Sequence, residues 1–114
     1  MSDYLDIFER YKYFNEITTL IDEVEKLREY YRTQQYDRMQ QHIDKLTIKY
    51  LFETLAWNAT HSSMPTTAYQ AYQNAEMFLR LKGISVLLSK GIKLQERLSA
   101  EELSFIESSI KSKV

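Results

Sequence analysis

The chain has no cysteine, one proline, two glycines and two histidines among its 114 residues. The absence of cysteine excludes a disulfide scaffold, thiol catalysis and thiolate zinc or iron–sulfur sites. The two histidines, His42 and His61, are too few for a three-histidine zinc site. So few glycines and prolines leave few places for sharp turns, which favours helices over a turn-rich β fold.

Neither sign of charge is in excess, and no long apolar run is present. The chain carries 15 Lys and Arg against 16 Asp and Glu, with a net charge of -1 and a pI of about 6.1. Binding to nucleic acid by bulk charge needs a concentrated basic face, so this balance argues against it. No apolar run approaches the ~18 residues of a membrane span, and the first residues do not resemble a secretory signal. We therefore expect a cytoplasmic protein whose residues 1–114 form a single helical domain.

Apolar residues recur at helical spacing along the first segment, from Asp3 to about Tyr31. Three adjacent heptad positions are apolar there and form one broad stripe. A helix of this length reaches about 43 Å, which is more than the width of a compact domain of this size. The sequence therefore predicts a homodimer that pairs through this long first helix.

A second helix is expected from Tyr36 to Trp57. A polar break at 32–35 precedes it, where Thr33 would cap the new helix and Asp37 would lie near its positive end. With this break, the first two helices form a long hairpin. The break contains neither glycine nor proline, so a single bent helix that runs through it is the alternative.

A loop at 58–66 contains the only proline and precedes a third helix. The third helix begins at a capping box of Thr67 and Gln70, in which each side chain covers a backbone N–H of the other residue. Gly83, within this helix, marks either a kink or a tight contact between helices. Gly91 is the clearer stop signal.

The start of the last helix is predicted by Ser99 and Glu102, which have the Ser-x-x-Glu spacing of a capping box. A hydrophobic staple of Leu98 on Leu103 flanks this capping box. Four helices are thus expected in all. The predicted fold is all-α, an antiparallel four-helix bundle with a long N-terminal helical hairpin.

No set of residues in the sequence is arranged for catalysis. His61 adjoins Ser62 and Ser63, but neighbours on a loop seldom have triad geometry. Arg38 and His42 resemble the Arg–His pair of the all-helical HEPN ribonucleases, although their spacing is shorter than in that family. Neither histidine has the Glu-x-x-His spacing of di-iron bundles. We therefore expect no enzyme, no catalytic residue, and neither a metal nor a cofactor.

The chain has nine tyrosines and one tryptophan, more than the core of a small helical bundle built from Leu and Ile needs. Tyrosine and tryptophan are enriched in protein interfaces. Tyr30, Tyr31 and Tyr36 gather at the break after the first helix, together with Arg32 and Arg38. Tyr31 falls on the apolar stripe and is expected in the core. The other four, Tyr30, Arg32, Tyr36 and Arg38, are the predicted protein-binding residues.

The function that these features favour is that of a non-enzymatic protein-binding helical bundle, acting through an exposed aromatic helical face on a partner of unknown identity. In size and helical build the chain is similar to small proteins that neutralise or regulate one target, such as bacteriocin immunity proteins and phage-encoded inhibitors. No motif carries this similarity, so no family is assigned.

The alternative function uses the C-terminal cations. Residues 75–114 hold seven basic against five acidic residues. Four of the basic residues lie close together in the sequence and could contact a nucleic-acid backbone: Lys82, Lys90, Lys93 and Arg97. The chain would then be a small helical subunit of an RNA–protein assembly. Binding to RNA should weaken steeply with salt, whereas an aromatic protein interface should change little.

Overall fold

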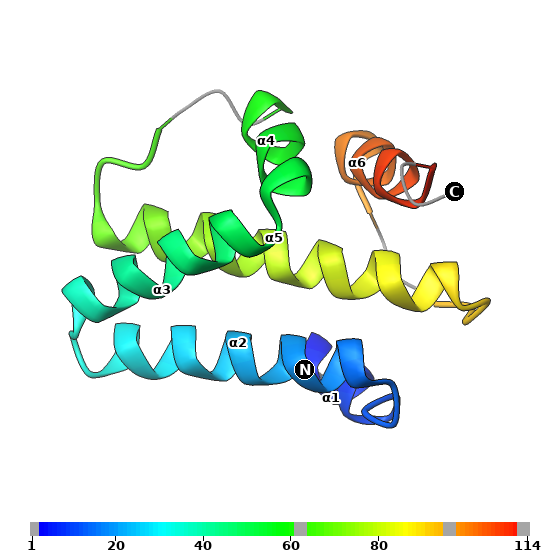
Figure 1. Ribbon diagram of the computed structural model, residues 1–114, viewed down its shortest axis with the longest axis horizontal. Helices are drawn as coiled ribbons and strands as arrows, with labels where there is room; N and C mark the ends of the chain where they lie inside the picture. Colours follow the sequence, from blue (N-terminus) through cyan, green and yellow to red (C-terminus); the bar gives the residue numbers. More distant parts are fainter. Residues whose placement is uncertain (1–2, 61–63, 95–97, 112–114) are drawn as a thin grey trace. The chain divides into compact units, whose positions relative to one another are not determined.

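The computed structural model describes residues 3–60, 64–94 and 98–111, and over these ranges the chain is helical with no strand (Figure 1). The described residues contain six helices: α1 (Tyr4–Glu9), α2 (Asn15–Arg32), α3 (Tyr36–Lys49), α4 (Leu51–Thr60), α5 (Ala68–Ser89) and α6 (Ala100–Lys111). The predicted all-α class is confirmed. The predicted number of helices is wrong, because six described helices stand where four were expected.

The chain divides into two compact units. One contains both ends of the chain, up to Asp22 and from Leu79 onward, and we call it the terminal unit. The other contains Glu23–Phe78, and we call it the central unit. The boundaries fall inside α2 and α5, so each of these helices contributes residues to both units.

The predicted single helix over 3–31 is wrong. α1 ends at Glu9, α2 begins at Asn15, and the chain turns between them. The Thr18 hydroxyl donates to the Lys12 carbonyl in this turn, which gives that backbone group a partner outside a helix. Threonine side chains compete in this way with helical hydrogen bonds. The homodimer through the first helix stays a prediction, but it can no longer rest on a continuous helix.

Gly83 on α5 provides space for the Phe8 ring of α1 in the terminal unit. A Cβ on residue 83 would lie 2.1 Å from Cζ of Phe8, far inside van der Waals contact. Phe8 is fully buried, and α5 remains helical through Gly83. Of the two predicted roles of Gly83, the tight contact between helices is confirmed.

The end of α5 follows the sequence signal. Gly91 has a φ of +82°, in the left-handed region that favours glycine. The Gly91 N–H donates to the Leu88 carbonyl and the Ile92 N–H donates to the Leu87 carbonyl, both at 3.0 Å. This is the pattern of a Schellman motif, so Gly91 stops the helix as predicted.

The capping box of α6 is also confirmed. The Ser99 N–H donates to Oε1 of Glu102 at 3.0 Å, and the Glu102 N–H donates to Oγ of Ser99 at 3.1 Å. Nη1 of Arg80 on α5 lies 3.1 Å from Oε2 of the same carboxylate. The bond from the Ser99 backbone is the main reason that the pKa of Glu102 is below its ordinary value, and Arg80 adds to this effect.

In the central unit, α2 and α3 turn back on one another around residues 33–35 (Figure 1). Gln34 has a φ of +59°, which ends α2, so the alternative of one bent helix is wrong. The predicted cap by Thr33 is also wrong. Its hydroxyl donates to the Glu29 carbonyl at 2.7 Å, four residues back, and the N-cap of α3 is Gln35 without a side-chain bond.

The predicted second helix over 36–57 is interrupted. α3 ends at Lys49, Tyr50 leaves the helical region with φ -112° and ψ 41°, and α4 begins at Leu51. The Thr54 hydroxyl lies within 3.2 Å of three carbonyl oxygens on both sides of this junction. The hydroxyl therefore adds a side-chain contact to carbonyls of the junction, and one of these, the Tyr50 carbonyl, also accepts from the Thr54 N–H at 2.8 Å.

The start of α5 contains half of the predicted capping box. The Gln70 N–H donates to Oγ1 of Thr67 at 3.1 Å, as expected. The Gln70 side-chain oxygen instead accepts from the N–H of Thr66 at 2.9 Å, one residue earlier than predicted. It also accepts from the Thr66 hydroxyl at 3.0 Å.

Candidate functional site

Four tyrosines meet in the central unit, and we call them the tyrosine cluster: Tyr31 from α2, Tyr36 from α3, and Tyr69 and Tyr72 from α5. Tyr31 is at the centre, because its ring centroid lies 5.9 Å from Tyr36, 6.0 Å from Tyr69 and 4.4 Å from Tyr72. Tyr31 and Tyr72 are half-buried, whereas Tyr36 is 43% and Tyr69 is 53% exposed. Two exposed rings thus rest on two half-buried rings, which holds an aromatic surface in place.

The base of the cluster is anchored by an ion pair between α2 and α5. Nη2 of Arg28 lies 2.6 Å from Oε1 of Glu76, and Nε of Arg28 donates to the same oxygen at 3.1 Å. Burial, followed by the hydrogen bond to Glu76, raises the pKa of the Tyr72 hydroxyl above its ordinary value. Tyr72 therefore keeps its proton at neutral pH.

The four predicted protein-binding residues do not form one group. Tyr36 belongs to the tyrosine cluster, but Tyr30 is half-buried and forms a T-shaped contact with His42, with 6.1 Å between the ring centroids. Arg32 is exposed and pairs with Glu29 at 2.5 Å. Arg38 is exposed and shares a shallow hollow at 34–38 with Tyr36.

Sequence reasoning missed the two tyrosines of α5. Tyr69 and Tyr72 are three residues apart and therefore lie on one side of their helix, a signal that the sequence does contain. Their contact with Tyr31 depends on how α5 packs beside α2 in the central unit, and helical periodicity alone does not reveal that packing.

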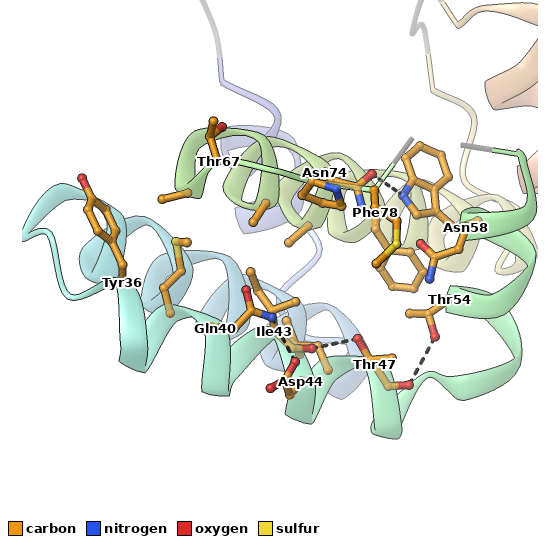
Figure 2. A pocket seen from close by; sticks show the side chains of 18 of the residues that line it. Tyr36, Gln40, Ile43, Asp44, Thr47, Thr54, Asn58, Thr67, Asn74 and Phe78 are labelled. Carbon is orange, nitrogen blue, oxygen red and sulfur yellow. Dashed lines mark hydrogen bonds between the residues drawn. The ribbon is translucent and has the colours of Figure 1, made fainter. Parts of the chain in front are cut away.

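A groove of about 560 Å³ adjoins the tyrosine cluster (Figure 2). It lies between α3, α4, α5 and the segment 64–67, with Tyr36 at one end and Thr54 and Asn58 at the other. The buried apolar residues of its wall come from three helices: Met39, Leu46, Trp57 and Phe78. Its volume is in the range of sites that take a small ligand or a few side chains of a partner.

The polar groups of the groove are largely bonded to one another. Nε1 of Trp57 donates to Oδ1 of Asn74 at 2.9 Å, and Nε2 of Gln40 donates to Oδ1 of Asp44 at 3.0 Å. Asp44 is the one charged residue among the described residues that line the groove. A ligand would therefore bind here mainly through apolar contacts.

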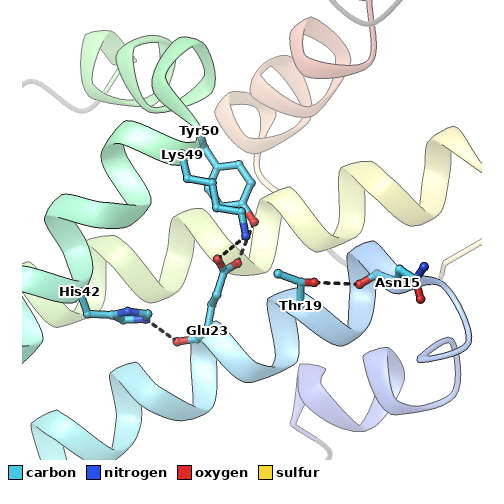
Figure 3. Close-up of polar contacts among 6 residues, drawn as sticks. All are labelled: Asn15, Thr19, Glu23, His42, Lys49 and Tyr50. Carbon is cyan, nitrogen blue, oxygen red and sulfur yellow. Dashed lines mark hydrogen bonds and ion pairs between the residues drawn. The ribbon is translucent and has the colours of Figure 1, made fainter.

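A buried carboxylate positions the α3 wall of this groove (Figure 3). Glu23 on α2 is 8% exposed, and its two carboxylate oxygens accept from Nζ of Lys49 at 2.9 Å and from the Tyr50 hydroxyl at 2.7 Å. Nε2 of His42 lies 3.0 Å from the Glu23 carbonyl, which can only accept, so Nε2 carries the hydrogen. These contacts tie the α3–α4 junction to α2 and give His42 a structural role.

The predicted nucleic-acid contacts are not presented together. Lys82 is buried, with 7% exposure. Nζ of Lys90 lies 3.1 Å from Oε1 of Glu16 and 4.7 Å from the ring centroid of Phe14. Lys93 is exposed, and Arg97 lies outside the described residues. The three described lysines therefore do not form one exposed basic patch.

The described part of the chain holds no group of three or more His, Asp or Glu side chains placed to bind a metal ion. His61, Ser62 and Ser63 lie outside that part. Among the described helices, none combines the length and apolarity needed to cross a bilayer. No protein-family model, curated protein or solved structure matches this chain.

Proposed function

We propose that this protein is a non-enzymatic protein-binding domain, of a regulatory, inhibitor or immunity type, that holds its partner through the tyrosine cluster and the adjoining groove. The observation that carries the proposal is the position of Tyr36. It is 43% exposed, contacts Tyr31 in the cluster, and lines both the groove and the hollow at 34–38. An exposed tyrosine at the edge of a concave apolar surface is typical of the residues that dominate protein interfaces.

Local charge indicates the chemistry of the partner. Arg38 is exposed beside Tyr36, whereas Arg32 is already paired with Glu29. An arginine binds a carboxylate through two parallel N–H donors. We therefore propose a partner segment that places an apolar side chain in the groove and an acidic side chain against Arg38.

Affinity capture from the native host with matched variants tests this proposal. Tyr36→Ala and Arg38→Ala should each weaken binding of the same captured protein at least tenfold, about 1.4 kcal/mol, because both remove surface contacts. Thermal stability should stay within about 0.5 kcal/mol of the parent. Tyr13→Ala, at a 69% exposed tyrosine of the terminal unit, is the control and should leave capture unchanged. Capture that is equally affected by all three variants contradicts the proposal.

The proposal includes the other expectations from the sequence: a cytoplasmic location, an antiparallel helical bundle and no cofactor.

The small subunit of an RNA–protein assembly remains the alternative. Nuclease treatment during capture separates the two, because a protein partner should survive it and an RNA-mediated one should be lost. Salt adds a second criterion, since phosphate contacts weaken steeply between low and physiological salt.

A further inference from the structure

α4 has its apolar side outward. Its exposed apolar residues are Leu51, Phe52, Leu55, Ala56 and Ala59. The residues turned inward are the half-buried Glu53, the buried Thr54 and the buried Trp57. At about 100° per residue, the five exposed apolar residues share an arc of about 140°. A surface helix of a globular protein ordinarily shows the opposite arrangement, with its apolar stripe inward and its charged residues outward.

We propose that these five residues, which we call the α4 face, pair with the same face of a second copy of this chain. The two α4 helices would run antiparallel about a two-fold axis near residues 55 and 56. This is the isologous arrangement in which one surface serves as its own partner.

The alternation of large and small side chains favours a second copy as the occupant. In the antiparallel register centred between residues 55 and 56, Phe52 lies opposite Ala59 of the partner subunit. In the same register Leu55 lies opposite Ala56 of the partner subunit. Phe52 and Leu55 thus each face a small side chain, which allows the two helices to approach closely and interdigitate.

Charge also favours self-pairing. The only charged residue of α4 is Glu53, and it is half-buried on the other side of the helix. Two copies of the α4 face therefore bring no like charges together. Depletion of charge at the centre is the compositional mark of an interface core.

The exposed area is sufficient for a dimer. Phe52 is 86% exposed, and Ile48, one turn earlier on α3, is 75% exposed. The pairing we propose extends from the α4 face to Ile48, and with Leu51 and Leu55 these residues expose on the order of 500 Å² of apolar surface on one copy. Pairing would bury about 1,000 Å² in total, which is the size at which specific interfaces begin.

The inference does not depend on the proposed function. The groove uses the inward side of α4, through Thr54 and Trp57, and Tyr36 is not part of the α4 face. Tyr36→Ala should therefore leave self-association unchanged, so the two proposals can fail separately.

Sedimentation equilibrium of the full chain up to ~100 µM tests the pairing. The parent should sediment as a dimer of the 13.6 kDa chain, with a Kd of ~1 µM or below. Phe52→Glu should weaken association at least 100-fold, because it buries an unpaired charge in the interface opposite Ala59 of the partner subunit. Tyr13→Glu, at the exposed tyrosine of the terminal unit, should remain a dimer. A monomeric parent at ~100 µM, or a dimer that Phe52→Glu leaves intact, overturns the inference.

A size swap tests the register and does not require Phe52→Glu to fold. Ala59→Phe should weaken association at least about tenfold although it adds apolar surface, because Phe52 then meets a second large ring. The double variant with Phe52→Ala and Ala59→Phe should restore association, because it exchanges the large and the small side chain at opposing positions. If Ala59→Phe strengthens association, the α4 face associates through apolar contact without a defined register, and the proposed register is wrong.

Discussion

The two units use their apolar residues differently. Among the described residues, eleven of the seventeen buried apolar side chains belong to the terminal unit. Eight of the ten exposed large apolar side chains belong to the central unit. These eight come from three helices and a loop: Tyr36, Ile48, Leu51, Phe52, Leu55, Met64, Tyr69 and Met77. Most apolar side chains of the terminal unit are thus buried in its core, whereas many large apolar side chains of the central unit are exposed.

This difference indicates a division of roles. Burial of apolar surface is the main favourable contribution to folding, so the terminal unit should contribute most to stability. Exposed apolar patches of several hundred Å² mark interaction sites, so the central unit should contribute most to binding. Substitutions of the same residue type in the two units test this division of roles.

The largest effect is expected from phenylalanine substitutions in the two units. Phe8→Ala should lower the free energy of unfolding by about 3–5 kcal/mol, because Phe8 is fully buried. Phe52→Ala should change it by about 0.5 kcal/mol or less, because Phe52 is 86% exposed. Urea denaturation at low protein concentration measures both. If the two variants lose similar amounts of free energy of unfolding, the proposed division of roles is wrong.

The next largest effect is expected at Gly83. Gly83→Ala should destabilise the protein by about 1–3 kcal/mol, because the new Cβ would lie 2.1 Å from Cζ of the confined Phe8 ring. A Gly-to-Ala change in a helix would otherwise stabilise by roughly 0.5–1 kcal/mol. Thermal denaturation should show rescue when Phe8→Leu is added. An increase in stability from Gly83→Ala alone would mean that α1 does not pack closely on α5.

Loss of a polar contact in the central unit should lower the stability of the protein. Tyr50→Phe removes the hydroxyl that donates to Oε1 of Glu23 at 2.7 Å and should cost about 1–2 kcal/mol. Tyr11→Phe, at a half-buried tyrosine of the terminal unit, serves as a comparison in the same denaturation series. If Tyr50→Phe has no effect, the contact with Glu23 does not hold the α3–α4 junction.

A smaller effect is expected at the α6 cap. Ser99→Ala removes the hydroxyl that accepts from the Glu102 N–H and should cost about 1 kcal/mol. Ser99→Asp should retain most of the stability, because aspartate caps equally well. Thermal denaturation that does not distinguish the Ala and Asp variants would mean that this capping box adds nothing.

The smallest effect is a dependence of stability on pH that involves Glu102. Folding lowers the pKa of this carboxyl below its ordinary value of 4.5, so its contribution is fully present above that value. The contribution is lost as the pH falls through the lower, folded-state pKa. Glu102→Gln should remove this part of the acid sensitivity, less than about 1 kcal/mol, when unfolding is followed from pH 7 to pH 3. An unchanged pH profile would contradict the assignment.

Features that depend on neighbours a few residues away could be predicted from the amino-acid sequence. The all-α class follows from the scarcity of glycine and proline. The capping box of Ser99 and Glu102 and the stop at Gly91 were correctly predicted. Each of these features joins backbone groups within one helical turn, so the residues that form it can be identified from the sequence.

Which apolar residues are covered depends on how the helices pack against one another, and this could not be predicted from the amino-acid sequence. Helical periodicity identifies an apolar face but not the element that packs against it. The outward α4 face, the meeting of Tyr31 with Tyr72 and the burial of Lys82 all depend on packing between segments distant in sequence. The break at Tyr50 is of the same kind, because a hydroxyl bond to Glu23, 27 residues away, accompanies it. Long-range contacts override local helix propensity at such points, which is why the chain folds into six described helices where its apolar pattern predicts four.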